Sequence, residues 1–301
     1  MQRTWTIENS TLTLSKGFFR LNEPLSKHIP LRCGGMCRAW IELCSMQELQ
    51  TTLQFLRKLK IKYRIHHPFE DWLVHDHGFD GVIIRMRGIF EQIQEVSEKR
   101  DEQGSLIHAS GIRVGVSALW SQIYFWQDIL GEWTGSVGGV IRNEQRICLR
   151  GWEYTLEIYK GKQFVYESID AKTTLRSIAP TELLTHVILH QPPKRKQNIR
   201  TKPLRNGELF LRTQGKSIQQ KRCGELLEVQ DLYGTRLRGW SVERFGGVFS
   251  HVPYMRESGQ STTIQATSDV LELYKGIREK IQRRMGIEIA LAVALIGRSK
   301  K

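Results

Sequence analysis

The apolar pattern of residues 45–84 constrains the fold most strongly, because a segment with helical spacing is followed at once by segments with strand spacing. Ser45 followed by Glu48 forms a capping box, and leucines then recur at three- and four-residue steps. This spacing predicts a helix over residues 46–60. The apolar segments after it are short and separated by turns, which predicts strands at 63–65, 72–74 and 82–84.

Strand-like and helical segments continue to alternate along the rest of the chain. Helical spacing predicts a helix at 117–128. A closing helix is expected with Ser268 as its cap and Gly286 as its stop, because the apolar residues between them lie on one face. Further strands are predicted at 112–116, 152–158, 164–166 and 183–190.

The length and charge of the chain limit its organisation and its partners. Its 301 residues exceed what one small core organises, so we expect about two domains with room for a small third. The 45 basic and 31 acidic side chains give a net charge of +14, which favours nucleic acid, a membrane surface or a phosphorylated small molecule. A uniformly solvated basic surface is the alternative.

The densest basic segment, residues 194–205, follows Pro192-Pro193 and is therefore predicted to be a linker. Aromatic residues do not alternate with its basic residues, so nucleic-acid binding is not expected.

Cysteine usage and hydropathy predict the cellular compartment. The five cysteines are an odd number and include no Cys-x-x-Cys pair, which is typical of reduced thiols in a cytoplasmic protein. Residues 1–16 lack the apolar segment of a signal peptide, and the longest apolar run, 289–296, is too short to span a bilayer. We expect a cytoplasmic protein without membrane insertion.

Two histidine clusters raise the question of a metal site, since imidazole and carboxylate are good ligands for zinc or iron. They are His66-His67 and His75-Asp76-His77. Adjacent strand residues point to opposite faces, so only His75 and His77 share a face, and no third ligand has a recognisable spacing. We expect surface turns and no metal.

A glycine-rich segment, residues 131–143, is the most chemically informative part of the sequence. It has four glycines within nine residues, and such glycines let backbone N–H groups approach a phosphate. The segment lacks both the lysine of a Walker loop and the spacing of the Rossmann fingerprint. A tight turn without a ligand is the alternative interpretation.

Several segments between Leu25 and Gly297 resemble those of one flavoenzyme family, in the same order. The opening segment ends in Arg32-Cys33-Gly34-Gly35, and residues 73–82 contain Asp76. Residues 135–141, followed by Asn143, resemble the family's flavin pyrophosphate loop. Further resembling segments are 207–210, 223–228 and 285–289. The sequence is therefore similar to the UDP-N-acetylenolpyruvoylglucosamine reductases, the MurB-type enzymes of peptidoglycan precursor synthesis.

The resemblance implies an α+β protein. A two-lobed FAD-binding region of the PCMH or vanillyl-alcohol-oxidase type would be followed by a smaller α+β substrate-binding domain. We expect the first FAD-binding lobe at 1–88, the second at 89–191, a basic linker at 192–206 and the substrate-binding domain at 207–301. A monomer is expected.

The resemblance also implies the reaction and its cofactors. In the family, NADPH passes a hydride to FAD, and the reduced flavin converts UDP-N-acetylglucosamine enolpyruvate to UDP-N-acetylmuramate. A UDP-sugar would be the substrate. The cofactor-binding residues that it implies are Gly34, Gly35, Asp76, Gly135, Ser136, Val137, Gly138, Gly139 and Asn143.

The sequence departs from the family at catalytic and cofactor positions. Arg176 is the best counterpart of the family's arginine, Glu208 replaces its proton-donating serine, and Ala292 replaces its late glutamate. Residues 67–71, His-Pro-Phe-Glu-Asp, stand where the family has a Gly-x-Gly-Ser-Asn turn around the flavin. We expect catalysis to depend on Arg176 and Glu208; the alternative for these two is a surface arginine and a solvated turn acid.

These departures also leave a second hypothesis for the whole chain. It is a catalytically degenerate homologue that binds a nucleotide sugar or a protein.

Overall fold

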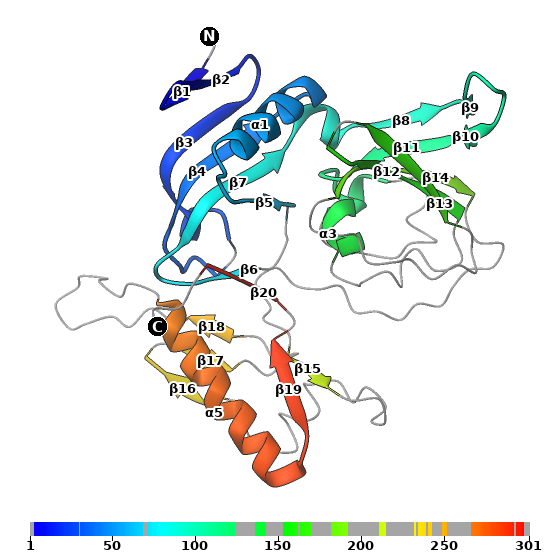
Figure 1. Ribbon diagram of the computed structural model, residues 1–301. Coiled ribbons are helices and arrows are strands. Elements are labelled where there is room, and N and C mark those ends of the chain that lie inside the picture. Colours follow the sequence, from blue (N-terminus) through cyan, green and yellow to red (C-terminus); the bar gives the residue numbers. More distant parts are fainter. Residues whose placement is uncertain are drawn as a thin grey trace. The chain divides into compact units, whose positions relative to one another are not determined.

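A computed structural model describes most of the chain (Figure 1). The described residues are 3–29, 31–68, 72–123, 136–142, 153–161, 163–169, 182–191, 211–214, 232, 234–238, 240–242, 249–251, 266–291 and 293–297. They divide into two compact units, each built from separate stretches of sequence. The first consists of Met1–Arg20, Ala39–Glu70 and Gly81–Leu204, and the second of Leu21–Arg38, Asp71–Asp80 and Arg205–Lys301.

The first unit begins with an antiparallel hairpin of β1 (Arg3–Ile7) and β2 (Ser10–Leu14), and its main helix is α1 (Met46–Lys58). The predicted helix at 46–60 is confirmed. Ser45 caps it by accepting a hydrogen bond from the backbone N–H of Glu48 at 3.2 Å, so that half of the predicted capping box forms. The leucines of α1 lie in a core that also contains the hairpin.

A four-stranded sheet has the order β3-β4-β7-β5, and β5 and β7 run parallel. Strands at 63–65 and 82–84 were expected from the sequence, and both are confirmed. The strands are β3 (Phe18–Pro24), β4 (Met36–Leu43), β5 (Tyr63–His66) and β7 (Phe79–Met86).

Besides an antiparallel pair of β9 and β10, the rest of the first unit contains a five-stranded antiparallel sheet of the order β13-β12-β14-β11-β8. One face joins the apolar core, against which the short helix α3 (Val137–Arg142) places Val137 and Ile141. The four strands predicted in this part are confirmed. The elements are η2 (Gly88–Glu91), β8 (Ile93–Val96), β9 (Lys99–Arg100), β10 (Leu106–His108), β11 (Gly111–Gly115), β12 (Glu153–Tyr159), β13 (Phe164–Ile169) and β14 (Leu183–Gln191).

The helix predicted at 117–128 is wrong over its described part. Leu119 is extended and forms a bridge with Ser136, and only a single 3-10 turn, η3 (Trp120–Gln122), follows. The carbonyls of Val116 and Ala118 accept hydrogen bonds from the segment that contains Ser136. In a helix, these carbonyls would accept hydrogen bonds from N–H groups of the same helix. Because they accept from the distant segment instead, a helix is excluded here.

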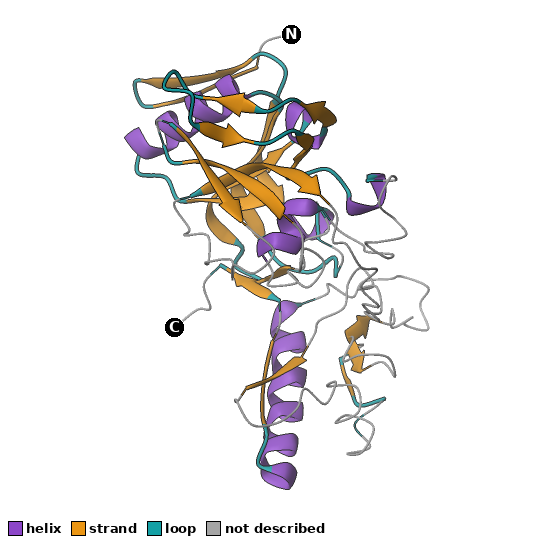
Figure 2. Ribbon diagram, turned by 90° about the vertical axis from the view of Figure 1, so that its right-hand side faces the viewer, coloured by secondary structure: helices purple, strands orange, loops and turns teal. Residues whose placement is uncertain are grey.

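The second unit is built around α5 (Thr267–Met285), the long helix in Figure 2. Its apolar face buries Val270, Leu273, Ile277 and Ile281, as the spacing predicted. It ends at Gly286, whose φ of 67° is the left-handed conformation expected of a stop glycine. The predicted cap is wrong, because the helix begins two residues earlier than expected and Ser268 lies inside it.

Short strands surround α5. The predicted strand at 72–74 is confirmed as β6, which pairs in parallel with β20. Two antiparallel groups complete the unit, β15 with β19 and β16-β17-β18. The elements are η1 (Leu25–Lys27), β6 (Trp72–Val74), β15 (Leu211–Gln214), β16 (Arg236–Leu237), β17 (Trp240–Val242), β18 (Phe249–His251), β19 (Glu288–Leu291) and β20 (Ala294–Ile296).

Helices and strands thus mix within both units, and the fold class is α+β, as expected. Among the described residues, none of the helices has the length and hydropathy needed to cross a membrane.

Candidate functional site

Within the described part of the glycine-rich segment, residues 136–142, the first four residues are held by hydrogen bonds within the first unit. Each of their four backbone N–H groups already donates to an acceptor of the chain. In order, the acceptors are Pro68 O at 3.3 Å, Ala118 O at 3.0 Å, Val116 O at 2.8 Å and Ser136 Oγ at 3.2 Å. No backbone donor of these four residues is therefore left for a phosphate in this conformation.

Gly138 lies directly against the side chain of His67. A Cβ atom at Gly138 would be 2.7 Å from His67 Nδ1, 2.8 Å from its Cε1 and 2.9 Å from Val116 Cβ. These distances are too short for real contacts, so the position requires glycine. The sequence predicted a close approach at this glycine, and the approaching group is an imidazole of the same chain.

The two histidines at this turn are buried, which corrects the expectation of a surface turn. His66 and His67 are 4% and 2% exposed. The ring of His66 lies 5.3 Å from that of Trp40, which is fully buried. In the other cluster, His77 is exposed and His75 is half-buried. The two histidine clusters looked equivalent in the sequence, but they differ in burial.

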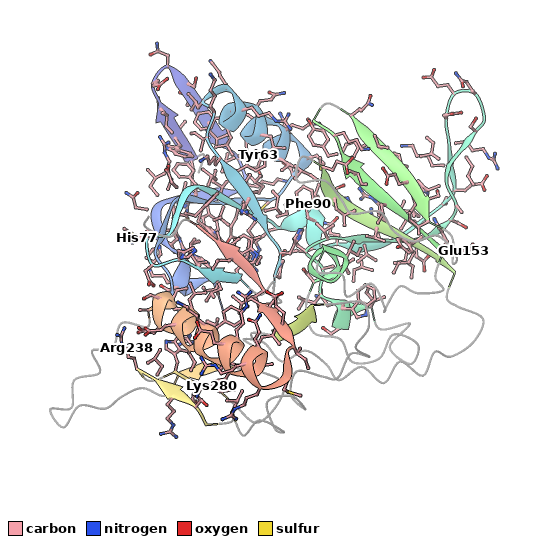
Figure 3. The ribbon with its side chains drawn as sticks, turned by 60° about the horizontal axis from the view of Figure 1, so that its bottom comes forward. Tyr63, His77, Phe90, Glu153, Arg238 and Lys280 are labelled. Carbon is pink, nitrogen blue, oxygen red and sulfur yellow. The ribbon has the colours of Figure 1, made fainter. Side chains whose placement is uncertain are left out.

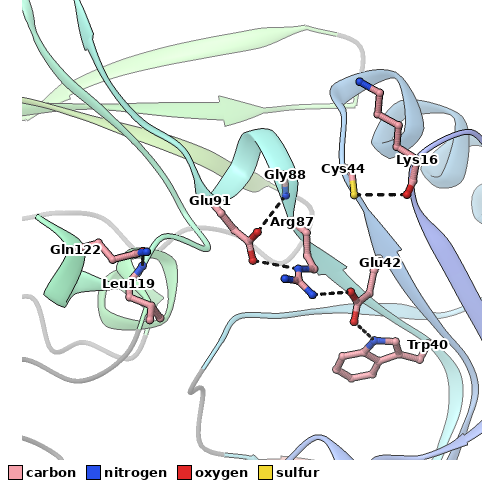
Figure 4. A network of polar contacts seen from close by, with 9 residues as sticks. All are labelled: Lys16, Trp40, Glu42, Cys44, Arg87, Gly88, Glu91, Leu119 and Gln122. Atoms are coloured by element: carbon pink, nitrogen blue, oxygen red, sulfur yellow. Dashed lines mark hydrogen bonds and ion pairs between the residues drawn. The ribbon is translucent and has the colours of Figure 1, made fainter.

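Trp40 is itself fixed by a polar network (Figure 4). Its indole N–H donates to Glu42 at 3.1 Å, and Arg87 donates to the second carboxylate oxygen of Glu42 at 3.3 Å. Arg87 also donates to Glu91 at 3.2 Å. This polar network holds the indole ring that lies beside His66.

Two buried donors near the glycine segment have no hydrogen-bond partner in the described structure. They are Ser117 Oγ and Trp120 Nε1, on residues that are 3% and 2% exposed. Ser117 lies between the two residues whose carbonyls hold the glycine segment. Buried polar groups are normally paired, so these two can serve a ligand or a water molecule. No pattern in the sequence indicated these two donors.

The predicted residues Gly34, Gly35 and Asp76 come together in the second unit. Gly34 has φ 101° and packs against Val74. Gly35 donates its N–H to His75 O at 3.0 Å, and a Cβ at Gly35 would be 2.2 Å from Asp76 O. The backbone of the opening segment therefore lies directly on the turn that contains Asp76.

The carboxylate of Asp76 is occupied by the N-terminus of α5. Its Oδ1 accepts from Thr267 N at 2.7 Å and its Oδ2 from Ser268 N at 3.0 Å. Burial raises the pKa of Asp76, but these backbone hydrogen bonds lower it more, and the pKa lies below its ordinary value. Arg238, labelled in Figure 3, donates to Asp269 in the same first turn at 2.7 Å.

The five-stranded sheet carries a buried ionic cluster that the sequence analysis missed. Arg113 makes two hydrogen bonds to Glu157, at 2.8 and 2.9 Å, and a third contact to His186 at 2.9 Å. Burial raises the pKa of Glu157, whereas His186 and Arg113 lower it, to about 2. An ionisable residue inside each of three predicted strands was the available signal.

Four predicted site residues, Gly135, Asn143, Arg176 and Glu208, lie outside the described residues, as does Ala292. Within the described ranges, no group of three or more His, Cys, Asp or Glu side chains has a geometry that could hold a metal ion.

Comparison with known proteins gives a consistent result. No family model matches the chain. The UDP-N-acetylenolpyruvoylglucosamine reductase of Moorella thermoacetica is 24% identical over 92% of both chains. That of Carboxydothermus hydrogenoformans is 34% identical over 40% of this chain and 39% of its own length. The crystal structure of UDP-N-acetylenolpyruvylglucosamine reductase (MurB) from Thermus caldophilus has a TM-score of 0.60 at 19% identity, and covers 93% of this chain and 100% of that one. The chain is therefore similar to MurB-type reductases over most of its length, and it shares the fold of the Thermus caldophilus enzyme.

The MurB-type resemblance implies FAD, whose pyrophosphate needs space and hydrogen-bond donors. At Gly138, the imidazole of His67 takes the space beside the glycine, and the N–H groups of Ser136–Gly139 are already bonded. A pyrophosphate does not fit against this segment as it stands. Ser117 and Trp120 remain as unpartnered donors. The cofactor contacts expected of the predicted residues stay predictions.

Proposed function

We propose that the protein is a flavin-dependent reductase that converts UDP-N-acetylglucosamine enolpyruvate to UDP-N-acetylmuramate in peptidoglycan precursor synthesis, with NADPH as reductant. The observation that carries the proposal is the extent of the likeness. It spans 92% of this chain and 92% of the Moorella reductase, and the fold covers the whole Thermus chain. A protein that had kept only a nucleotide-binding part of the family would not align over this length.

The charge of the chain supports anionic ligands of this kind. FAD and the UDP-sugar each contain a pyrophosphate, NADPH has three phosphate groups, and the substrate also has a carboxylate. A net charge of +14 favours the approach of all three. We propose that the protein acts in the cytoplasm as a monomer.

Two residues are proposed to act on the enolpyruvyl group. After hydride transfer, negative charge develops on the carbon next to the substrate carboxylate. Arg176 would stabilise this charge, and Glu208 would protonate the same carbon. Glu208 must then be protonated near neutral pH, which requires its pKa to rise from about 4.3 to about 7, at a cost of roughly 3.7 kcal/mol. A closed site without water supplies such a shift.

The second candidate function is a binding module that keeps the fold and has lost the reaction. The specific observation that favours it is the contact between His67 and Gly138, which leaves no space for a pyrophosphate there. Such a protein would still bind the UDP-sugar.

A turnover assay with purified protein tests the proposal. The full chain is mixed with excess FAD, NADPH and UDP-N-acetylglucosamine enolpyruvate. NADPH oxidation is followed by absorbance, and the product by its mass, which rises by two hydrogens. We expect one lactyl ether per NADPH. Binding of the UDP-sugar in calorimetry without any product at saturating FAD would establish the second candidate instead.

A further inference from the structure

We propose that Arg85 anchors a phosphate-binding site on the second face of the four-stranded sheet, with Arg64 as the neighbouring cation. The ligand is a phosphate group, either as the free ion or as a phosphate monoester. The inference is independent of the proposed function, because it rests on the burial and the charges of this face alone.

The second face of the sheet is the one opposite to the apolar core. Strand β7 contributes Val82 and Ile84 to that core, and successive strand residues point to opposite faces, so Arg85 lies on the second face. Arg64 of β5 lies there too, because it is in register with Ile83. The register places Arg64 and Arg85 diagonally on adjacent strands, with their Cα atoms about 8 Å apart. Both long side chains can therefore reach one anion between them.

Arg85 has a positive charge that the described chain does not neutralise. It forms no hydrogen bond or ion pair with the described residues. Its Nε is buried without a partner, although the residue as a whole is half-buried. A buried donor without an acceptor costs free energy, and arginine stays protonated at any ordinary pH. An anion from outside the chain would supply the missing acceptor, and Arg85 has no existing partner to give up for it.

Two aromatic rings lie beside Arg85 on this face. Trp40 comes from β4 and His66 from β5, the strands on either side of β7, and their rings lie 5.3 Å apart. His66 is also in register with Arg85. The two rings therefore meet over β7 next to Arg85, and neither of them is an acid.

The carboxylate that β4 places on this face is already bonded. Glu42 accepts from Trp40 Nε1 at 3.1 Å and from Arg87 at 3.3 Å (Figure 4). Arg64 is exposed and, like Arg85, forms no ion pair with the described residues. Two unpaired guanidinium groups match the double negative charge of a phosphate better than the single charge of a carboxylate.

Phosphate titration of the full chain tests the site. Calorimetry is done at constant ionic strength with inorganic phosphate, uridine monophosphate and acetate. The variants are Arg85→Met, Arg85→Lys and Arg64→Gln. Arg57→Gln is the matched control, because Arg57 is an exposed arginine of the same unit without an ion pair to the described residues.

We expect Arg85→Met to weaken phosphate binding about tenfold or more, as for the loss of a hydrogen bond to a charged group. Arg64→Gln should weaken it by a smaller factor, and Arg57→Gln should have little effect. Arg85→Lys keeps the charge but loses the planar pair of donors, so it should also bind more weakly than the wild type. Binding of uridine monophosphate but not of the free ion, lost in Arg85→Met, would support the site and identify its ligand as the phosphate group of a larger molecule.

Three results would overturn the inference. Equal weakening by Arg85→Met and Arg57→Gln would show that phosphate responds only to the net charge of the chain. Acetate binding as tight as phosphate binding would exclude a site for a dianion. The third result is a wild type that binds neither phosphate probe.

Thermal unfolding tests the unpaired guanidinium even if binding is weak. Without phosphate, Arg85→Met should unfold at the same temperature as the wild type or higher, because methionine removes a buried donor that lacks an acceptor. Phosphate should raise the unfolding temperature of the wild type but not that of Arg85→Met. A clear loss of stability of Arg85→Met in phosphate-free buffer would show that the guanidinium has a partner within the chain, and the proposal would fail.

Discussion

The carboxylate of Asp76 caps helix α5 at Thr267, which lies 191 residues further along the chain. Both carboxylate oxygens accept backbone N–H groups of the first turn, and Thr267 Oγ1 donates to Val74 O at 2.5 Å. Ala266, the residue that precedes the helix, has only a methyl side chain and cannot accept a hydrogen bond as a cap. The cap therefore ties the turn after β6 to the main helix of the second unit.

Loss of this cap should destabilise the second unit. Asp76→Ala removes both acceptors, and we expect a loss of about 1–2 kcal/mol in the free energy of unfolding, as for other N-caps. Asp76→Asn keeps one acceptor oxygen and should lose less. Urea unfolding at neutral pH measures both, with the exposed and adjacent His77→Ala as control.

The pH dependence of the cap has a definite sign. The folded pKa of Asp76 is depressed, so its contribution is fully present above the ordinary carboxyl pKa of about 3.9 and is lost as the pH falls through the folded value. Asp76→Asn should remove this part of the acid sensitivity. An identical acid profile in the wild type and Asp76→Asn would contradict the cap.

Substitution of Glu48 should destabilise the first unit. Its Oε1 accepts the backbone N–H groups of Ser15, Lys16 and Gly17 at 2.7–2.9 Å, and its Oε2 accepts that of Cys44 at 2.9 Å. The amide of Glu48→Gln accepts at one atom only, so at least one buried donor loses its partner. We expect a loss of about 1–3 kcal/mol in thermal or urea unfolding. Glu91→Gln, at a more exposed carboxylate, should cost less.

The free energy of unfolding should fall strongly when one partner of the buried Arg113–Glu157 pair is removed alone. Arg113→Met leaves the Glu157 carboxylate buried without its guanidinium, and we expect a loss of about 3 kcal/mol. The double change to Arg113→Met and Glu157→Leu should restore part of it. Glu153→Gln is the control, because Glu153 lies on the same strand and is exposed (Figure 3). Equal stability of single and double variants would show that the charges are not coupled.

The stabilisation that this pair provides should decrease at low pH. Since the pKa of Glu157 is depressed to about 2, its contribution is present above the ordinary glutamate pKa of about 4.3 and disappears between that pH and about 2. The unfolding free energy of Glu157→Leu, measured in this window, should change less with pH than that of the wild type.

Two glycines, one inside α5 and one directly after it, should respond to alanine in opposite directions. Gly276 lies inside the helix with no atom near its missing Cβ, so Gly276→Ala should stabilise the protein by about 0.5–1 kcal/mol. Gly286 has φ 67°, a conformation that costs alanine about 1 kcal/mol, so Gly286→Ala should destabilise it. Thermal unfolding distinguishes the two, and a gain at Gly286 would contradict its role as the stop of the helix.

The proposed acid of the reaction can be tested separately from cofactor binding. Glu208→Gln should slow oxidation of the reduced flavin by the enolpyruvyl substrate about a hundredfold or more, while reduction of the flavin by NADPH stays normal. Stopped-flow absorbance follows each half-reaction. If both half-reactions of Glu208→Gln keep the wild-type rates, Glu208 is not the proton donor.

The sequence by itself determined the elements whose signals are local. The leucine spacing after Ser45 gave α1, and the apolar face from Val270 to Ile281 together with Gly286 gave the body and end of α5. Both depend on residues within a few turns of one another, so neighbouring side chains suffice to specify them. The strands follow for the same reason, and the order of resembling segments was enough to indicate the MurB-type fold.

Only the tertiary structure decided the features that depend on distant partners. The cap of α5 comes from Asp76, so a search near Ser268 could not find it. Leu119 and Ile123 have helical spacing, but Leu119 pairs with Ser136 instead. The glycines at 138–139 indicated a close approach, but the approaching group is His67. In the first two cases a backbone donor or acceptor is satisfied by a residue far away in sequence, and in the third a distant side chain packs against a glycine. The local sequence pattern contains no information about which distant residue that is.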